Sequence, residues 1–158
     1  MSTPRARRVE VPQSLRSSEI FKDSNYASAF ELATPDARSR TPEQWGRTTF
    51  EGAPALLQRV LRLGWTLVLG LRMGGRSEPG HVLGWLISDS GSESMTLESH
   101  SGLVATYNVV EVTDASVVWA TSVRFNRRFS RVIWGMAAPV HHLAVPYLLK
   151  RASRSAAR

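Results

Sequence analysis

The chain has 158 residues, 42% hydrophobic and 21% charged, which is typical of one globular domain burying roughly 70% of its unfolded surface. It contains no cysteine, which excludes disulfides, thiolate nucleophiles and cysteine-ligated zinc. The formal net charge is +7, and seven of the twenty basic residues lie near the ends: Arg5, Arg7, Arg8, Lys150, Arg151, Arg154 and Arg158. Residues 9–149 hold thirteen basic and thirteen acidic side chains, so we expect a neutral body and no nucleic-acid partner.

The domain organisation follows from these ends. Residues 1–20 are predicted to form a flexible basic arm, residues 21–152 a single folded domain and residues 153–158 a basic tail. The first ten residues do not resemble a secretory signal, so we expect a cytoplasmic location. Residues 132–149 carry no formal charge, but this run contains two prolines and two histidines. We therefore expect a buried helix and no integral membrane association.

A first strand is predicted over residues 25–32, where every second residue alternates with a small or polar neighbour: Tyr26, Ser28, Phe30 and Leu32. A helix is predicted to begin at Pro42, because Thr41 suits the N-cap position and Gln44 stands three residues later, as in a capping box. Gly52 ends or interrupts this helix.

A second helix is predicted over residues 54–63, with Gly64 as its stop signal. Residues 65–73 are apolar and rich in strand-forming residues, and the glycines of residues 74–80 predict a loop. Short links then separate further candidate strands, a spacing that favours antiparallel pairing: residues 81–88, 94–99, 103–112 and 116–125.

A long final helix is predicted over residues 126–152, with an apolar stripe at three- and four-residue steps: Phe129, Val132, Ile133, Met136, Val140, Leu143, Ala144 and Tyr147. This helix is the element long enough to cover one face of the sheet. The order of elements predicts an α+β helix-grip fold, in which a curved antiparallel sheet wraps around a long C-terminal helix and two short helices follow the first strand. A ligand would lie between sheet and helix.

The chain resembles domain-of-unknown-function family 2867, within the START, polyketide-cyclase and Bet v 1-like helix-grip superfamily. The resemblance covers about residues 23–152. It rests on dispersed short motifs: TPEQW at 41–45, LGLR at 69–72, VLGW at 82–85, TSVRFN at 121–126, and the segment from Trp134 through PVHH at 139–142 to VPYLL at 145–149. It implies the fold and an internal cavity, and no activity.

Several polar residues are candidates for catalysis. Adjacent histidines His141 and His142 offer a general base near neutral pH, but neighbours on a helix diverge by about 100°, so at most one faces the cavity. Packing or capping is the alternative role for both. Glu111 and Glu98 become candidates if their strands turn them inward, because a buried carboxyl has a raised pKa. No metal site is expected.

The residues expected to contact a ligand are aromatic, polar or flexible side chains of the strands and the final helix: Trp85, Tyr107, Trp119, Thr121, Met136 and Tyr147. Alternation in residues 116–125 turns Trp119 and Thr121 inward, whereas the inward face of residues 103–112 is undecided. If the odd-numbered residues of that strand face inward, Tyr107 and Glu111 lie in the cavity.

The sequence therefore predicts a domain that binds a hydrophobic or aromatic small molecule without a cofactor. It is either a cofactor-free enzyme of the cyclase, dehydratase or isomerase type, or a non-catalytic carrier or sensor. A third hypothesis is a dimerisation module with a filled core, in which an outward apolar face of the final helix meets a second copy through Trp134, Val145 and Leu149.

Overall fold

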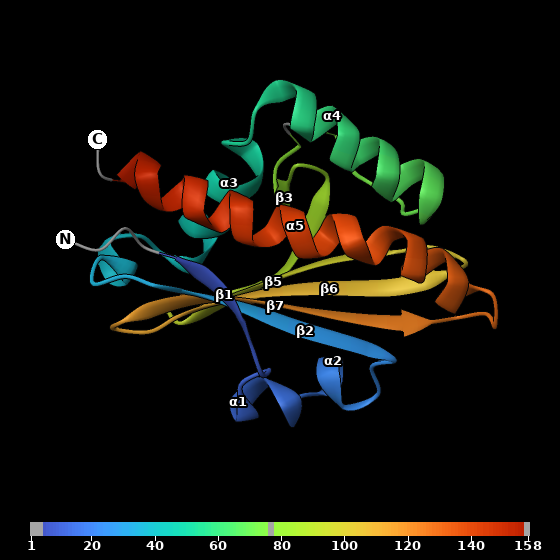
Figure 1. Ribbon diagram of the computed structural model, residues 1–158, viewed down its shortest axis with the longest axis horizontal. Helices are drawn as coiled ribbons and strands as arrows, with labels where there is room; N and C mark the ends of the chain where they lie inside the picture. Colours follow the sequence, from blue (N-terminus) through green and yellow to red (C-terminus); the bar gives the residue numbers. More distant parts are fainter. Residues whose placement is uncertain (1–4, 76–77, 157–158) are drawn as a thin grey trace.

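The computed structural model describes residues 5–75 and 78–156, and it has an α+β fold built on one antiparallel sheet (Figure 1). Within the described residues the sheet has seven strands in the order β1-β2-β7-β6-β5-β4-β3. Their bounds are β1 Ala6–Val9, β2 Tyr26–Ala33, β3 His81–Val82, β4 Trp85–Ser90, β5 Ser94–His100, β6 Val104–Val112 and β7 Ser116–Phe125. Every neighbouring pair is antiparallel, as predicted.

The helices form layers on both faces of the sheet (Figure 1). One face carries α3 (Pro42–Glu51), α4 (Ala55–Leu63), the π-helical turn η2 (Gly64–Val68) and the long α5 (Ser130–Ala156). The other carries the short helices α1 (Gln13–Arg16) and α2 (Glu19–Lys22). A 3₁₀ turn, η1 (Ala37–Ser39), links β2 to α3. The main hydrophobic core lies between the sheet and the layer that contains α5.

The predicted start of α3 is confirmed in its hydrogen bonds. The Gln44 amide donates to Thr41 Oγ1 at 3.1 Å, and the Thr41 amide donates to Gln44 Oε1 at 2.8 Å, which completes a capping box with Pro42 at the first helical position. The helix ends at Glu51, before Gly52. Local chemistry therefore sets the start of α3.

The helix α4 ends at Leu63 with Gly64 as its C-cap residue, as predicted, but Gly64 does not turn the chain out of helical conformation. Gly64 has right-handed helical angles, φ −61° and ψ −46°, and the chain continues into η2 with the Leu69 amide bonded to the Gly64 carbonyl. A glycine stops a helix when it adopts a left-handed conformation, and this one does not. Residues 65–73 consequently contain no strand, although Leu69 and Leu71 are buried in the core.

The predicted strand over residues 81–88 is two strands. Leu83 and Gly84 have positive φ angles of 48° and 94°, and they form the two-residue turn between β3 and β4. Such tight hairpin turns require positive φ, which glycine tolerates and a leucine rarely adopts. Burial of the Leu83 side chain in the core compensates for this backbone strain.

The N-terminal segment differs from the predicted flexible arm. Strand β1 pairs with β2 along its whole length, and Arg7 lies 3.3 Å from Glu31. Val11 and Phe21 join a second, smaller core on the opposite face of the sheet, together with Ala29, Val109, Val118 and Ala120. Apolar burial therefore holds residues 6–22 against the sheet. Residues 1–4 of the arm and 157–158 of the tail lie outside the described residues, and residues 153–156 belong to α5.

Most of the predicted inward stripe of α5 lies on its exposed side, although Met136, Val140 and Ala144 also line the cavity described below and Ile133 packs against the core. Six large apolar members of the stripe are exposed: Phe129, Val132, Met136, Val140, Leu143 and Tyr147. The buried face instead comprises Trp134, Val145, Leu148, Leu149 and Ala152. Three of these residues, Trp134, Val145 and Leu149, are those that the dimerisation hypothesis assigns to contact with a second copy, and their burial contradicts that assignment. Both faces are apolar, so hydrophobic periodicity alone could not choose between them.

Candidate functional site

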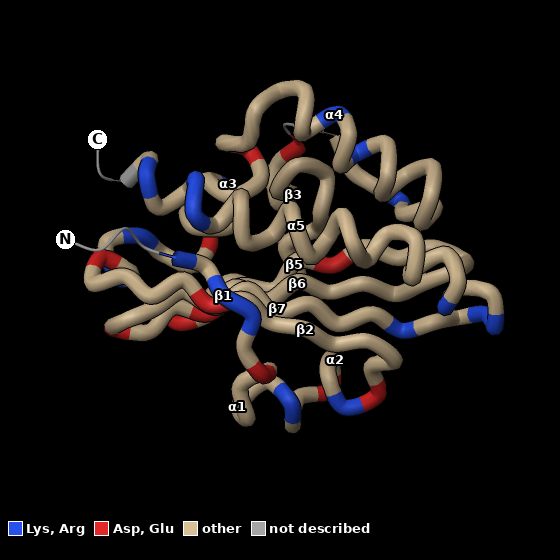
Figure 2. The backbone as a smooth tube through the Cα atoms, viewed as in Figure 1, with Lys and Arg blue, Asp and Glu red and all other residues tan. Residues whose placement is uncertain are grey.

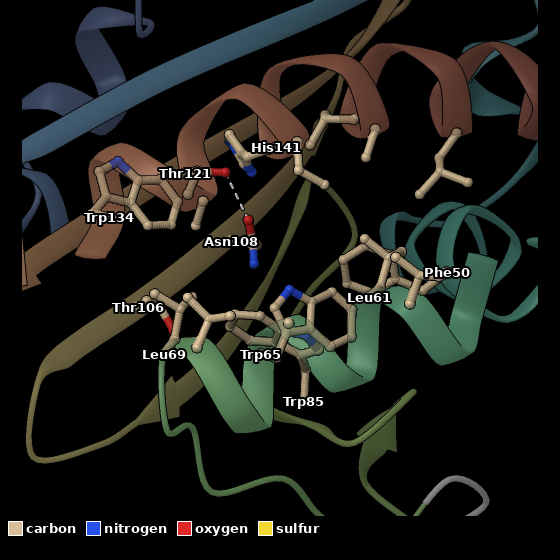
Figure 3. Close-up of a pocket in the computed structure, with 18 of the residues that line it drawn as sticks. Phe50, Leu61, Trp65, Leu69, Trp85, Thr106, Asn108, Thr121, Trp134 and His141 are labelled. Atoms are coloured by element: carbon tan, nitrogen blue, oxygen red, sulfur yellow. Dashed lines mark hydrogen bonds between the residues drawn. The ribbon is translucent and has the colours of Figure 1, made fainter. Parts of the chain in front are cut away.

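A cavity of about 290 Å³ lies between the inner face of the sheet and the helical layer (Figure 3). Its floor consists of inward side chains of β4, β6 and β7, and its walls come from α3, α4, η2 and α5. Small-molecule sites commonly enclose roughly 300–1,000 Å³, so this cavity suits a small ligand. The lining is almost entirely aromatic and aliphatic, with Thr106, Asn108, Thr121 and His141 as its polar members.

Four aromatic side chains form a cluster on one side of the cavity, two from the sheet and two from the helical layer. Phe50 stacks with tilted or edge geometry against Trp65 and Trp119, with ring centroids 5.2 and 4.9 Å apart. Trp65 meets Trp85 edge to face at 5.4 Å. Indole rings present broad apolar surfaces with a polar N–H at one edge, and Trp85 Nε1 is buried with no hydrogen-bond partner among the described residues. This cluster suits a flat or bulky apolar ligand.

Asn108 is a buried polar residue whose side-chain amide faces the cavity. Its side-chain oxygen accepts hydrogen bonds from Trp119 Nε1 at 3.0 Å and Thr121 Oγ1 at 2.7 Å. An indole nitrogen can only donate, so the Asn108 oxygen must face Trp119 and the amide nitrogen must point the other way. Figure 3 shows that nitrogen directed into the cavity, and the residue is only 4% exposed.

The Asn108 amide nitrogen has no hydrogen-bond partner within residues 5–75 and 78–156. A ligand that fills the cavity without an acceptor would bury this donor unpaired at a cost of about 1–3 kcal/mol, and a ligand oxygen would avoid this cost. The cavity therefore offers two N–H donors at a fixed position on an otherwise apolar floor.

His141 is the titratable residue that lines the cavity. It projects from α5, and its Nε2 lies 3.5 Å from Ser28 Oγ of β2. Burial, followed by repulsion from His142 and Arg8, lowers the pKa of His141 to about 4. The imidazole is therefore neutral at pH 7 and offers one N–H and one lone pair rather than a charge.

His142 lies outside the cavity lining. Its Nε2 is hydrogen bonded to the Tyr26 hydroxyl at 2.5 Å, and the two rings are stacked 6.0 Å apart. Burial lowers the pKa of His142 and raises that of Tyr26. The two histidines thus have different roles: His141 belongs to the cavity, and His142 packs against β2, as the angular spacing of helix neighbours predicts.

Other predicted site residues divide between the two faces of the sheet. Trp85, Trp119, Thr121 and Met136 line the cavity. The alternation of β6 turns its even-numbered residues inward, so Tyr107 and Glu111 lie on the outer face. The prediction that Tyr107 contacts a ligand is therefore wrong, and the condition under which Glu111 would face the cavity is not met. The contacts of these residues also lie on the outer face. Tyr107 packs edge to face against His100, and the His100 ring lies 3.7 Å from the carboxylate of Glu98. Ser14 Oγ lies 3.5 Å from the carboxylate of Glu111.

Tyr147 was predicted to contact a ligand, and it is half exposed on the outward face of α5 instead. The sequence analysis missed Asn108 and Trp65. The sequence contained a signal for Asn108, because this polar residue stands at an even-numbered position of an apolar strand whose inward face was undecided. Trp65 carried no usable signal, since its position depends on the helix continuing through Gly64 into η2.

The cavity opens between the α4–η2 segment and α5. Its lining includes four residues that are also at least two-fifths exposed, with two on each side of this gap: Val60, Val68, Met136 and Val140. A ligand therefore enters past apolar side chains, and the buried polar group Asn108 lies on the floor opposite.

Comparison of the chain with protein-family models, with curated proteins and with solved structures found no significant match.

Proposed function

We propose that the chain binds one hydrophobic small molecule in the cavity between its sheet and α5, and that sheet and helix form a helix-grip fold. The observation that supports this function is a cavity of about 290 Å³ walled by Phe50, Trp65, Trp85 and Trp119. Transfer of apolar ligand surface into such a site contributes about 25 cal/mol per Å². The antiparallel sheet with a long C-terminal helix on one face supports the fold.

The ligand carries a hydrogen-bond acceptor, such as a carbonyl, carboxylate or hydroxyl oxygen, at its buried end. The support is the free amide nitrogen of Asn108, whose orientation Trp119 fixes. A pure hydrocarbon would leave these donors unpaired, and unpaired buried donors are the main source of discrimination between otherwise similar ligands.

Binding without catalysis is the function that this lining supports best, because an apolar chamber with neutral polar groups retains a ligand without activating it. Acid–base catalysis by His141 is a second candidate, favoured by a neutral imidazole in the cavity wall. The two functions are separable: a His141→Gln variant of a binding protein keeps its ligand affinity, and the same variant of an enzyme loses turnover.

Thermal unfolding with matched ligands tests the proposal. Tetralin and 1-tetralone share one bicyclic skeleton and differ by a carbonyl oxygen. A ligand at about one hundred times its Kd stabilises the folded state by about 2.7 kcal/mol, which is a rise in Tm of roughly 5–10 °C for a chain of this size. We expect 1-tetralone to raise Tm at lower concentration than tetralin. No rise in Tm across a panel of flat and aliphatic ligands would contradict the proposal.

Two neighbouring residues of α5 provide matched variants. Ala144 lines the cavity, and Leu143 is 76% exposed on the other face. Ala144→Phe fills part of the cavity and should abolish the ligand-dependent rise in Tm, whereas Leu143→Phe should leave it unchanged. Circular dichroism of each variant without ligand establishes that it is folded. Equal ligand responses in both variants would place the binding site elsewhere.

A further inference from the structure

Two stripes of large apolar side chains are exposed on the helical layer, one on each side of the cavity opening. The stripe on α5 comprises Val132, Met136, Val140, Leu143 and Tyr147, which are 50–76% exposed. The stripe on α4 and η2 comprises Leu56, Val60, Leu63, Leu67 and Val68, which are 40–77% exposed. We name these two stripes together the α4–α5 face. Contiguous exposed apolar surface of this kind marks an interaction site.

The charged residues of the segments that form the α4–α5 face have one sign. Residues 52–77 and 115–158, which include α4, η2 and α5, contain twelve basic and no acidic residues, although the chain has thirteen acidic residues in all. Figure 2 shows blue segments without red ones along α4 and at both ends of α5. The stripe on α5 itself continues in steps of three and four residues from Tyr147 to Lys150 and Arg154. Arg127, Arg128 and Arg131 lie at its other end, and all three are exposed.

We propose that the α4–α5 face docks on the surface of an anionic lipid bilayer. Helices that lie in the membrane interface bury an apolar stripe at the boundary between headgroups and acyl chains, and their basic residues attract anionic headgroups. Both components are present here on one face. α5 would remain packed on the sheet through Trp134, Leu148 and Leu149. By length and composition alone α5 could also span a bilayer, a property that core helices share.

A second copy of the chain fits this face less well than a lipid surface does. A symmetric dimer through the α4–α5 face would bring the basic ends of two α5 helices together, in either relative orientation. Neither helix contains an acidic residue that could pair with them. Like charges facing each other oppose association, whereas anionic lipid headgroups supply the missing negative charge.

Docking in this orientation would turn the cavity opening toward the lipid. Val60 and Val68 on one side and Met136 and Val140 on the other line the cavity and belong to the exposed stripes. An apolar ligand could then pass between bilayer and cavity without crossing water. This consequence rests on the proposed ligand binding, whereas the docking itself does not, so the two are tested separately.

Co-sedimentation with vesicles tests the docking. We expect the full chain to sediment with vesicles of phosphatidylcholine and phosphatidylglycerol in equal parts, and not with phosphatidylcholine alone. Raising the salt from about 0.1 M to about 1 M should reduce binding, because the screening length falls from about 10 Å to about 3 Å. Equal binding to both vesicle types, or binding that salt does not affect, would contradict the electrostatic part of the proposal.

Matched variants locate the face. Val132 and Leu143 lie on the exposed stripe and outside the cavity lining, and the double variant Val132→Glu, Leu143→Glu should lose vesicle binding by at least tenfold. Leu86, 42% exposed on β4, provides the control Leu86→Glu, which should bind as the unmodified chain does. For charge, Arg154→Glu should weaken binding about fivefold or more, and Arg16→Glu on α1, across the sheet, should not.

Two results would overturn the proposal. One is equal vesicle binding by the Val132→Glu, Leu143→Glu variant and by Leu86→Glu, which would place the membrane contact elsewhere. The other is a failure to bind anionic vesicles together with a concentration-dependent dimer in sedimentation velocity that Leu143→Glu dissociates. That second result would assign the face to self-association. Neither result depends on whether 1-tetralone raises Tm.

Discussion

The two faces of α5 are similarly apolar, but one is buried against the core and the other is exposed. The inward face turns Trp134, Val145 and Leu148 toward the cavity and the core, whereas the outward face exposes Val132, Leu143 and Tyr147. A helix that is apolar all round is expected to be buried all round or to meet a second apolar phase. The outward face of α5 has no such cover in the described structure. The difference shows that apolar side chains identify which surfaces of a helix favour a partner. The basic residues at the ends of α5 then indicate the chemistry of the partner for its exposed face.

The largest expected effect separates the two faces by stability. Leu149 is fully buried and Leu143 is 76% exposed, and both lie on α5. Leu149→Ala should lower the free energy of unfolding by about 2–5 kcal/mol, because it removes buried surface and leaves a cavity. Leu143→Ala should change it by less than about 0.5 kcal/mol. Urea unfolding of the two variants measures both values, and equal losses would show that the outward face is covered.

The second prediction concerns pH and the inward face. Burial lowers the pKa of His141 to about 4 from 6.5. Between these two values the unfolded chain binds a proton that the folded chain does not, so stability is lost as the pH falls from 6.5 to 4 and levels off below 4. One pKa unit corresponds to about 1.4 kcal/mol, so the fall from 6.5 to about 4 gives a loss from His141 of roughly 3–4 kcal/mol at most.

Urea unfolding between pH 7 and pH 4 tests this assignment. His141→Gln removes the titrating group and should flatten the decline in unfolding free energy over that range. A decline of unchanged slope in His141→Gln would assign the pH dependence to another group, with His142 as the next candidate because burial also lowers its pKa.

The sequence predicted β2, β5, β6 and β7 well, because alternation and short turns set these strands, whereas β1 lies in the predicted arm and one predicted strand is divided into β3 and β4. β7 has its predicted bounds, and Trp119 and Thr121 face inward as expected. The helical layer was harder, since its errors depend on tertiary packing. Gly64 continues a helix, and the stripe chosen on α5 lies outward, because neither backbone angles nor the position of the sheet can be derived from local composition. The cavity lining was accordingly predicted on β4 and β7, not on β6, and only in part on the helices.

The smallest expected effect concerns the polar group opposite α5. Asn108→Asp keeps an acceptor for Trp119 and Thr121 but presents a carboxylate oxygen to the ligand in place of two N–H donors. In this variant the 1-tetralone oxygen loses one hydrogen bond and faces another acceptor. Its binding should therefore weaken about tenfold, equivalent to about 1.4 kcal/mol, whereas tetralin binding should change little. Isothermal titration of both ligands gives the two ratios. A similar loss for tetralin would mean that the substitution alters the shape of the cavity, and that Asn108 has a structural role instead of recognising a ligand oxygen.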